Sequence, residues 1–95
     1  MTKKEIVEEI SRKISGENKK DIKVIVEAFM DSIKESVEKG EKVYLRKFGT
    51  FRPKKRMEKK ARVISENKEI IIPEHFIPDF KPSAEFKSSV KEKVK

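Results

Sequence analysis

Lysine and arginine side chains gather in one short stretch of the sequence, from Arg52 to Lys68. This stretch holds eight Lys or Arg against two Glu, so seventeen residues carry a net charge of +6, out of +8 for the whole chain. Such an excess of like charge opposes compaction and supplies little apolar surface, so the stretch is not expected to form core. Ammonium and guanidinium groups bind phosphate oxygens, and the pattern therefore predicts a polyanionic partner.

The same stretch contains two adjacent apolar residues, Val63 and Ile64, just before the turn-forming sequence Ser65-Glu66-Asn67. Cations along a projection with a small apolar tip are what a protein needs in order to wedge into DNA. The pattern therefore indicates phosphate contacts along the projection and an apolar wedge at its tip. As an alternative, Val63 and Ile64 pair across the projection or pack into the groove of a partner.

The sequence shows no arrangement of residues for catalysis or metal binding. It has no cysteine, no glycine-rich phosphate loop and a single histidine, His75, without a second histidine or a cysteine to complete a metal site. Its carboxylates are spread over helix faces beside lysines. We therefore expect a protein that is not an enzyme and has no metal, cofactor or small-molecule substrate. The absence of a long apolar run predicts no membrane association, no signal peptide and a cytoplasmic location.

Residues 1–40 are expected to form a hairpin of two amphipathic helices. Apolar residues recur at intervals near 3.6 in two runs, which is the period of one helix face. Capping or terminating residues stand at the ends of these runs: Thr2 with Glu5, Gly16, Asn18 with Asp21, and Gly40. A side-chain oxygen at the start of a helix satisfies a free backbone amide, and glycine at its end adopts the left-handed conformation.

Beyond the helices the period of the apolar residues changes to two, which favours strands. Residues 41–51 and 69–82 are expected to form a sheet, in which Gly49 permits a bend or a close backbone approach. Residues 52–75, which overlap the start of the second segment, should form a β-ribbon arm. If residue 52 pairs near residue 75, each side has about eleven residues and the arm reaches roughly 36 Å, more than the width of a DNA duplex.

Residues 83–95 should form a last helix, which Ser83 caps and which presents Phe86 and Val90 on one face. The 95 residues are expected to form a single domain over 1–95. Without the charged arm, roughly seventy residues remain to form a core, a size at which burial is marginal. A partner chain would therefore stabilise the fold.

The sequence resembles the bacterial HU/IHF family of DNA-bending proteins. The resemblance rests on Lys47-Phe48-Gly49-Thr50-Phe51, the basic arm, Ile72-Pro73 and Phe80-Lys81-Pro82, and it covers nearly the whole chain. It implies an α+β fold of the IHF type: an intertwined dimer in which each subunit has a helical hairpin, a three-stranded antiparallel sheet, a long arm and a C-terminal helix. The two arms of that dimer embrace double-stranded DNA through the minor groove.

The arm tip departs from the usual family pattern. Where the family has Gly-Arg-Asn-Pro-x-Thr-Gly, this chain has Ala61-Arg62-Val63-Ile64-Ser65-Glu66-Asn67. The family's proline enters between base pairs and kinks the duplex. Ile64 occupies the proline's position, so the resemblance makes it the DNA wedge.

The resemblance implies a histone-like architectural protein of the nucleoid, which binds double-stranded DNA with little sequence specificity, bends it and condenses it. We expect a homodimer, or a heterodimer with a paralogue. Three alternatives remain at this point: an IHF-like site-specific bender, a binder of RNA or single-stranded nucleic acid, and a dimerisation module whose arm tip grips a protein.

The expected DNA-binding residues lie mainly in the arm. They are Arg52, Lys54, Lys55, Arg56, Lys59, Lys60, Arg62, Val63, Ile64 and Lys68, extended over the body by Lys3, Arg46, Lys47, Lys81 and Lys87. The expected dimer core contains Phe29, Phe48, Phe51 and Phe80. In a single-strand binder the phenylalanines of the sheet would instead stack on unpaired bases.

Overall fold

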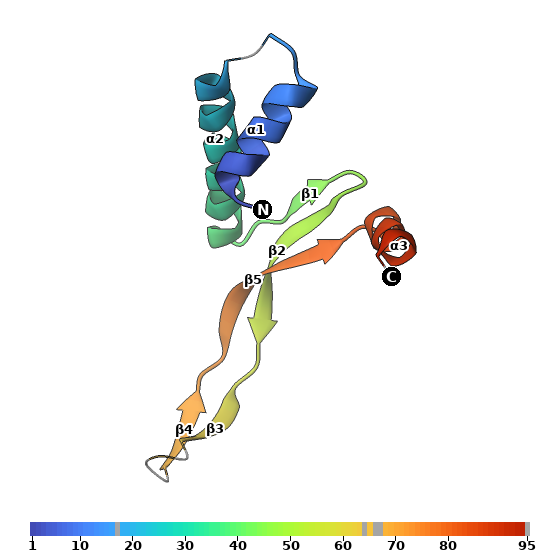
Figure 1. Ribbon diagram of the computed structural model, residues 1–95. Helices are drawn as coiled ribbons and strands as arrows, with labels where there is room; N and C mark the ends of the chain where they lie inside the picture. The colour runs from blue at the N-terminus through green and yellow to red at the C-terminus, as the bar shows by residue number, and fades with distance from the viewer. Residues whose placement is uncertain (17, 64, 66–67, 95) are drawn as a thin grey trace. The chain divides into compact units, whose positions relative to one another are not determined.

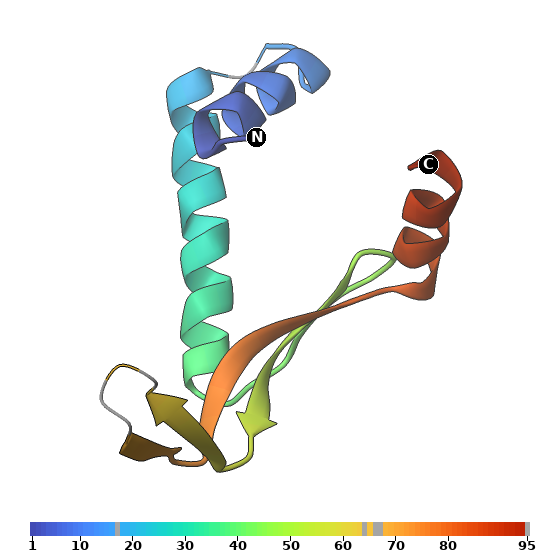
Figure 2. The same ribbon diagram turned by 60° about the horizontal axis from the view of Figure 1, so that its bottom comes forward.

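The structure is a computed structural model that describes residues 1–16, 18–63, 65 and 68–94 (Figures 1 and 2). Along this part of the chain the elements are α1 (Lys3–Lys13), α2 (Lys19–Glu38), β1 (Val43–Leu45), β2 (Gly49–Arg56), β3 (Lys59–Val63), β4 (Lys68–Ile72), β5 (His75–Pro82) and α3 (Ala84–Lys93). The chain divides into two compact units, Met1–Glu35 and Ser36–Lys95. The combination of helices with antiparallel sheets confirms the predicted α+β class.

The predicted caps of α1 and α2 are confirmed. Thr2 accepts a hydrogen bond from the backbone amide of Glu5 at 3.3 Å, and Gly16 has a left-handed φ of 89°. The Asn18 side chain caps α2, but it accepts from the amide of Lys20 at 2.8 Å. None of the helices in the described residues is long and apolar enough to cross a membrane.

The apolar faces of α1 and α2 are covered only in part. In the described part of the single chain, Val7 and Ile22 are the buried hydrophobic residues, at 8% and 5% exposed. Further along the apolar face of α2, Ile25 is 65% exposed, Phe29 50% and Met30 41%. The helices therefore present more apolar surface than this unit covers by itself.

The second unit contains a three-stranded antiparallel sheet of order β1-β2-β5. A short turn joins β1 to β2, in which Lys47 has a left-handed φ of 66° and the amide of Phe48 donates to the carbonyl of Leu45 at 3.0 Å. Gly49 follows, and a Cβ there would lie 2.6 Å from the carbonyl oxygen of Lys81 and from the ring of Phe80. Of the two roles predicted for Gly49, the close backbone approach is the one observed.

Prolines restrict the register of β2 against β5. Pro53 stands opposite Pro78, and Pro82 stands opposite Gly49. Because proline has no N–H, these pairs must be the type that exchanges no hydrogen bonds between the two strands. The hydrogen-bonded pairs are then their neighbours, such as Arg52 with Asp79. A slip by one residue would place proline where the ladder needs a donor, so the prolines exclude registers shifted by an odd number of residues.

The arm consists of two ladders rather than one continuous hairpin. The first continues the sheet and pairs β2 with β5 as far as Arg56 and His75. The second pairs β3 with β4, from Lys59 opposite Ile72 to Val63 opposite Lys68. Residues 57–58 and 73–74 between the ladders belong to no strand, and Figure 2 shows the β3–β4 hairpin turning away from β2 and β5 at this point.

The predicted pairing of residue 52 near residue 75 is wrong, because Arg52 pairs with Asp79. Residue 75 instead lies opposite Arg56. On one side β2 continues past residue 52 as far as Arg56, whereas on the other side β5 begins at His75. The observed alignment is the one that places Phe51 against Phe80, with 4.7 Å between ring centroids, and Arg52 within 3.2 Å of Asp79.

Four phenylalanine rings and the cap of α3 hold the far end of the sheet together. Phe51 and Phe80 lie 4.7 Å apart between ring centroids, and Phe48 stacks on Phe86 of α3 at 5.4 Å. Ser83 accepts from the amide of Phe86 at 3.2 Å, as predicted, and also donates to the carbonyl of Lys47 at 2.9 Å. One hydroxyl therefore caps α3 and fastens it to the β1–β2 turn.

Candidate nucleic-acid interface

The β3–β4 ladder carries cations that have no ionic partner among the described residues. Lys59, Lys60 and Lys68 are exposed, and the ion pairs found within the described part of the chain do not include them. The register places Arg62 opposite Glu69, so the two charged side chains share one face of the hairpin. Four Lys or Arg against one Glu make these two strands strongly basic.

The β2–β5 ladder pairs some of its cations with acids. The Nε atom of Arg52 lies 3.2 Å from Asp79 Oδ2, and both side chains are largely shielded from solvent. The Nζ atom of Lys55 lies 2.9 Å from Oε1 of Glu74, where both side chains are about half exposed. These two predicted DNA-binding cations are therefore partly neutralised by the arm itself.

Lys54 and Arg56 are exposed on the face of β2 that is opposite to Phe51. Neither forms an ion pair with a described residue. Together with Lys59 they line an open depression of about 720 Å³ at the junction of the two ladders, where His75 also lies. With Lys55, which also lines it, the depression places four cations at the point where the arm changes direction.

His75 forms a hydrogen bond with the backbone two residues before it. Its Nδ1 lies 2.9 Å from the carbonyl oxygen of Pro73, and since a carbonyl only accepts, Nδ1 carries the hydrogen. Nowhere among the described residues do three His, Cys, Asp or Glu side chains gather as metal ligands would.

The predicted cations outside the arm lie in three different settings. Arg46 and Lys47 are exposed in the β1–β2 turn. Lys81 is exposed opposite Thr50, on the face of the sheet that is turned away from the phenylalanines. Lys87 belongs to α3 and lines an apolar cavity.

Lys3 of α1 is paired with Glu27 of α2. The Nζ of Lys3 donates to Glu27 Oε1 at 2.8 Å. This hydrogen bond, together with the positive charge of Lys3, lowers the pKa of Glu27 below its usual range. Lys3 is thus partly neutralised within its own unit, as Arg52 and Lys55 are within the arm.

Tyr44 is a residue of the polar sheet face that the interpretation of the sequence did not single out. It is 73% exposed and lies opposite Thr50, on the same face of the sheet as Arg52 and Lys81. Strand alternation could have found it, because Val43 and Leu45 on either side point to the aromatic face.

The arm tip is described only in part. Ile64, the predicted wedge, lies outside the described residues. The backbone of its neighbour Val63 pairs with Lys68 as the last pair of the β3–β4 ladder. The wedge assignment of Ile64 therefore stays a prediction.

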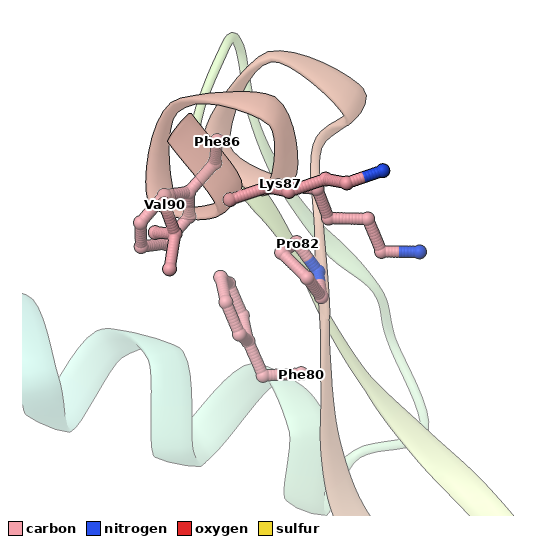
Figure 3. Close-up of a pocket in the computed structure, with 6 residues that line it drawn as sticks. Phe80, Pro82, Phe86, Lys87 and Val90 are labelled. Carbon is pink, nitrogen blue, oxygen red and sulfur yellow. The ribbon is translucent and has the colours of Figure 1, made fainter. Parts of the chain in front are cut away.

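An apolar cavity of about 400 Å³ opens between β5 and α3. Figure 3 shows Phe80 and Pro82 of β5 on one side and Phe86 and Val90 of α3 on the other, while the ammonium group of Lys87 extends away from the rings. Phe48 beside it is 44% exposed and Val90 46%. The aromatic cluster is thus open to solvent along this side in the single chain.

Comparison with known proteins identifies the family. The model of the family described as "Bacterial DNA-binding protein" matches residues 1–91. This chain belongs to the bacterial HU/IHF family. The DNA-binding protein HU of Thermotoga maritima is 40% identical to it over 91 residues, covering 96% of this chain and 100% of that protein. The integration host factor subunit alpha of Pseudoalteromonas atlantica is 36% identical over 90 residues, covering 95% of this chain and 91% of that protein.

The HU/IHF fold is also found among solved structures. The chain of the Anabaena HU–DNA cocrystal structure matches with a TM-score of 0.88 at 30% identity, covering 95% of this chain and 97% of that one. The prediction of an HU/IHF fold is therefore confirmed. This solved HU chain was crystallised with DNA, a polyanion, and the basic faces described above are the surfaces of this chain that suit such a ligand.

Proposed function

We propose that this protein is a histone-like architectural protein that binds double-stranded DNA with little sequence specificity, bends it and condenses the nucleoid. The observation that carries the proposal is a set of exposed cations in the β3–β4 ladder and at its junction with β2 that form no ion pair with a described residue: Lys54, Arg56, Lys59, Lys60 and Lys68. The names of the HU relatives and the Anabaena HU–DNA complex support the choice of DNA as the polyanion. HU and IHF proteins are themselves standard examples of minor-groove binders.

The DNA-binding surface that we propose has a centre and a periphery. Its centre consists of Lys54, Arg56, Lys59, Lys60, Arg62 and Lys68, with Val63 and Ile64 at the tip. Its periphery consists of Arg46, Lys47 and Lys81, which are exposed, and of Lys3, Arg52 and Lys55, whose charges are partly neutralised by Glu27, Asp79 and Glu74.

The experiment measures the affinity for a mixed-sequence duplex as a function of salt concentration. Each phosphate neutralised contributes about −0.9 to the slope of log K against log salt. Replacing Lys59, Lys60 and Lys68 with Ala should therefore flatten the slope by up to about 2.7 per protomer. Replacing three exposed helix and turn lysines, Lys13, Lys34 and Lys39, is the matched control and should change the slope little. A parent protein with a flat slope would contradict the proposal.

We propose that the functional form is a homodimer in which a second copy covers the apolar surfaces left open in one chain. Phe29 of α2, the cavity between β5 and α3, and the exposed side of Phe48 are the surfaces that support this proposal. Phe51 and Phe80 contribute from the adjoining aromatic cluster. Sedimentation equilibrium should show a dimer at micromolar concentration, and a compact monomer there would overturn it.

We propose that Ile64 inserts between base pairs and concentrates the bend. Kinks made by inserted side chains are roughly 20 to 90°. Energy transfer across a duplex labelled at both ends measures the bend, and Ile64→Ala should reduce it while most of the salt-dependent affinity remains. An unchanged bend would remove Ile64 from the mechanism and leave charge as the cause of bending.

A site-specific function of the IHF type is the second candidate, which the similarity to an integration host factor subunit favours. Such proteins read sequence through the deformability of DNA. Footprinting on mixed sequences separates the two functions, since a specific bender protects one site and a general one protects none in preference.

A further inference from the structure

The β3–β4 ladder exposes aliphatic side chains as well as cations. Ile70 is 45% exposed, Ile71 60% and Ile72 37%. Successive residues of a strand point to opposite faces, so Ile71 lies on one face of the hairpin while Ile70 and Ile72 lie on the other. Both faces of a solvent-exposed, highly charged ribbon therefore carry apolar surface.

Each isoleucine stands directly across from a residue of β3. Ile71 pairs with Lys60 and Ile72 with Lys59, while Ile70 pairs with the half-buried Ala61. Side chains directly opposite one another have Cβ atoms about 4.5–5.5 Å apart. Aliphatic groups and ammonium groups thus alternate within a few ångströms on the same faces, and the flexible lysine chains carry their charge outward from the isoleucines.

This alternation restricts the chemistry of the occupant. The cations of β3 require a polyanion, whereas the isoleucines gain free energy only if apolar surface covers them at the same time. The groove of a DNA duplex offers both, because phosphates edge it and deoxyribose C–H groups line its walls. The minor groove of an RNA duplex displays 2′-hydroxyls instead. Covering these hydroxyls with aliphatic side chains would remove their water without replacing its hydrogen bonds.

We propose that Ile70, Ile71 and Ile72 select duplex DNA over duplex RNA by packing against deoxyribose while Lys59 and Lys60 reach the flanking phosphates. The inference rests on the proposed DNA-binding function and adds a discrimination that charge alone does not provide. Phosphates are common to both nucleic acids, so the cations attract either one. The sugars differ, and the isoleucines are the arm residues whose contact depends on that difference.

Strand propensity is the competing explanation for the isoleucines, since β-branched residues favour strands whatever they touch. Threonine is also β-branched and also favours strands. Replacement of the three isoleucines with Thr therefore keeps the preference for the ladder and removes most of the apolar surface. The substitution leaves every charge in place.

The experiment compares the affinities of the protein for a DNA duplex and an RNA duplex of equivalent sequence at one salt concentration. The parent should prefer DNA. The variant Ile70→Thr/Ile71→Thr/Ile72→Thr should lose about tenfold of that preference, mainly through weaker DNA binding, because several methyl and methylene groups leave the contact. The slope of log K against log salt should stay unchanged.

Three controls make the result decisive. Ile71→Val keeps an aliphatic side chain and should keep most of the preference, while Val24→Thr alters an aliphatic residue of α2 that is 63% exposed and should leave the preference intact. The single variant Ile71→Thr provides the same comparison with less perturbation if the triple variant melts early.

Salt-dependent DNA binding with an unchanged ratio of DNA affinity to RNA affinity in the Thr variants overturns this inference alone. A flat salt slope in the parent overturns the proposed function instead.

Discussion

The β2–β5 ladder and the β3–β4 ladder belong to one arm, but their cations have different partners. In β2, Arg52 is held by Asp79 and Lys55 by Glu74. In β3, Lys59 and Lys60 make no ion pair with any residue that the structure describes. The sequence shows one uniformly basic stretch, whereas the fold divides it into a partly neutralised base and a basic end. The charge available to a ligand is therefore determined by cross-strand register as well as by composition.

The largest expected effect comes from reversing charge at the basic end. At about 0.1 M salt, a slope of −0.9 per phosphate corresponds to roughly a tenfold contribution to the affinity for each phosphate bound. The variant Lys59→Glu/Lys60→Glu should therefore bind duplex DNA at least about a hundredfold more weakly. Fluorescence anisotropy with a labelled duplex measures the change. The control variant Lys13→Glu/Lys34→Glu has the same change in net charge. An equal loss of DNA affinity in that control would mean that the arm has no specific role in DNA binding.

The next effect concerns stability and should appear in the β2–β5 ladder but not at the basic end of the arm. A Cβ at residue 49 would lie 2.6 Å from the Lys81 carbonyl oxygen, which is backbone and cannot move aside easily. Gly49→Ala should lower the free energy of unfolding by roughly 1–3 kcal/mol, the usual effect of overpacking. Ile71→Thr, on the exposed end, should change it far less. Chemical denaturation of both variants tests the contrast, and similar losses would contradict it.

A rise in DNA affinity is expected when the neutralising acids are removed. In Glu74→Gln/Asp79→Asn, the cations Lys55 and Arg52 lose their partners and become available to phosphates. For each phosphate that they then bind, the affinity should rise by up to about tenfold and the salt slope should steepen by up to about 0.9. Glu8→Gln/Glu35→Gln changes the net charge equally on the helices. If both double variants bind DNA more tightly to the same degree with unchanged slopes, the ion pairs have no specific influence.

The smallest effect concerns the Lys3–Glu27 pair, which extends the comparison to the helices. Since the pKa of Glu27 is lowered from its usual 4.5 by Lys3, the pair stabilises the folded state at pH values above about 4.5. That contribution is lost as the pH falls through the lowered pKa of the folded state. Both groups are exposed, so the effect should be slight. Thermal melting between pH 3 and 6 should show a smaller decline for Glu27→Gln than for the parent.

Local signals in the sequence predicted the ends of the elements well. Thr2, Gly16, Asn18 and Ser83 act where their side chains or backbone freedom indicate, because capping depends on residues within one turn of the helix. The basic arm was equally visible, because like charges in a row exclude a buried position.

The register of the arm could not be predicted in the same way. The position of Arg52 opposite Asp79 depends on how two segments 27 residues apart align, and no capping or turn residue near either one determines that alignment. The partly neutralised state of Arg52 and Lys55 follows from the alignment, and so it was missed. The prolines exclude only registers shifted by an odd number of residues, and the pairing of residue 52 with residue 75 is shifted by four, so they leave it open.

The same prolines also affect the outer edge of β5. In the described sheet β5 is an edge strand with β2 on one side only. The residues of β5 that form no backbone hydrogen bonds with β2 direct their N–H and C=O groups toward the outer edge. Two of these residues are Pro78 and Pro82, which have no N–H, so Phe76 and Phe80 are left as the outward donors of this strand. A strand from another molecule that paired with this edge would lack every second N–H donor and could not extend the sheet. The residues that restrict the alignment of the arm therefore also protect this apolar, phenylalanine-rich strand from aggregation.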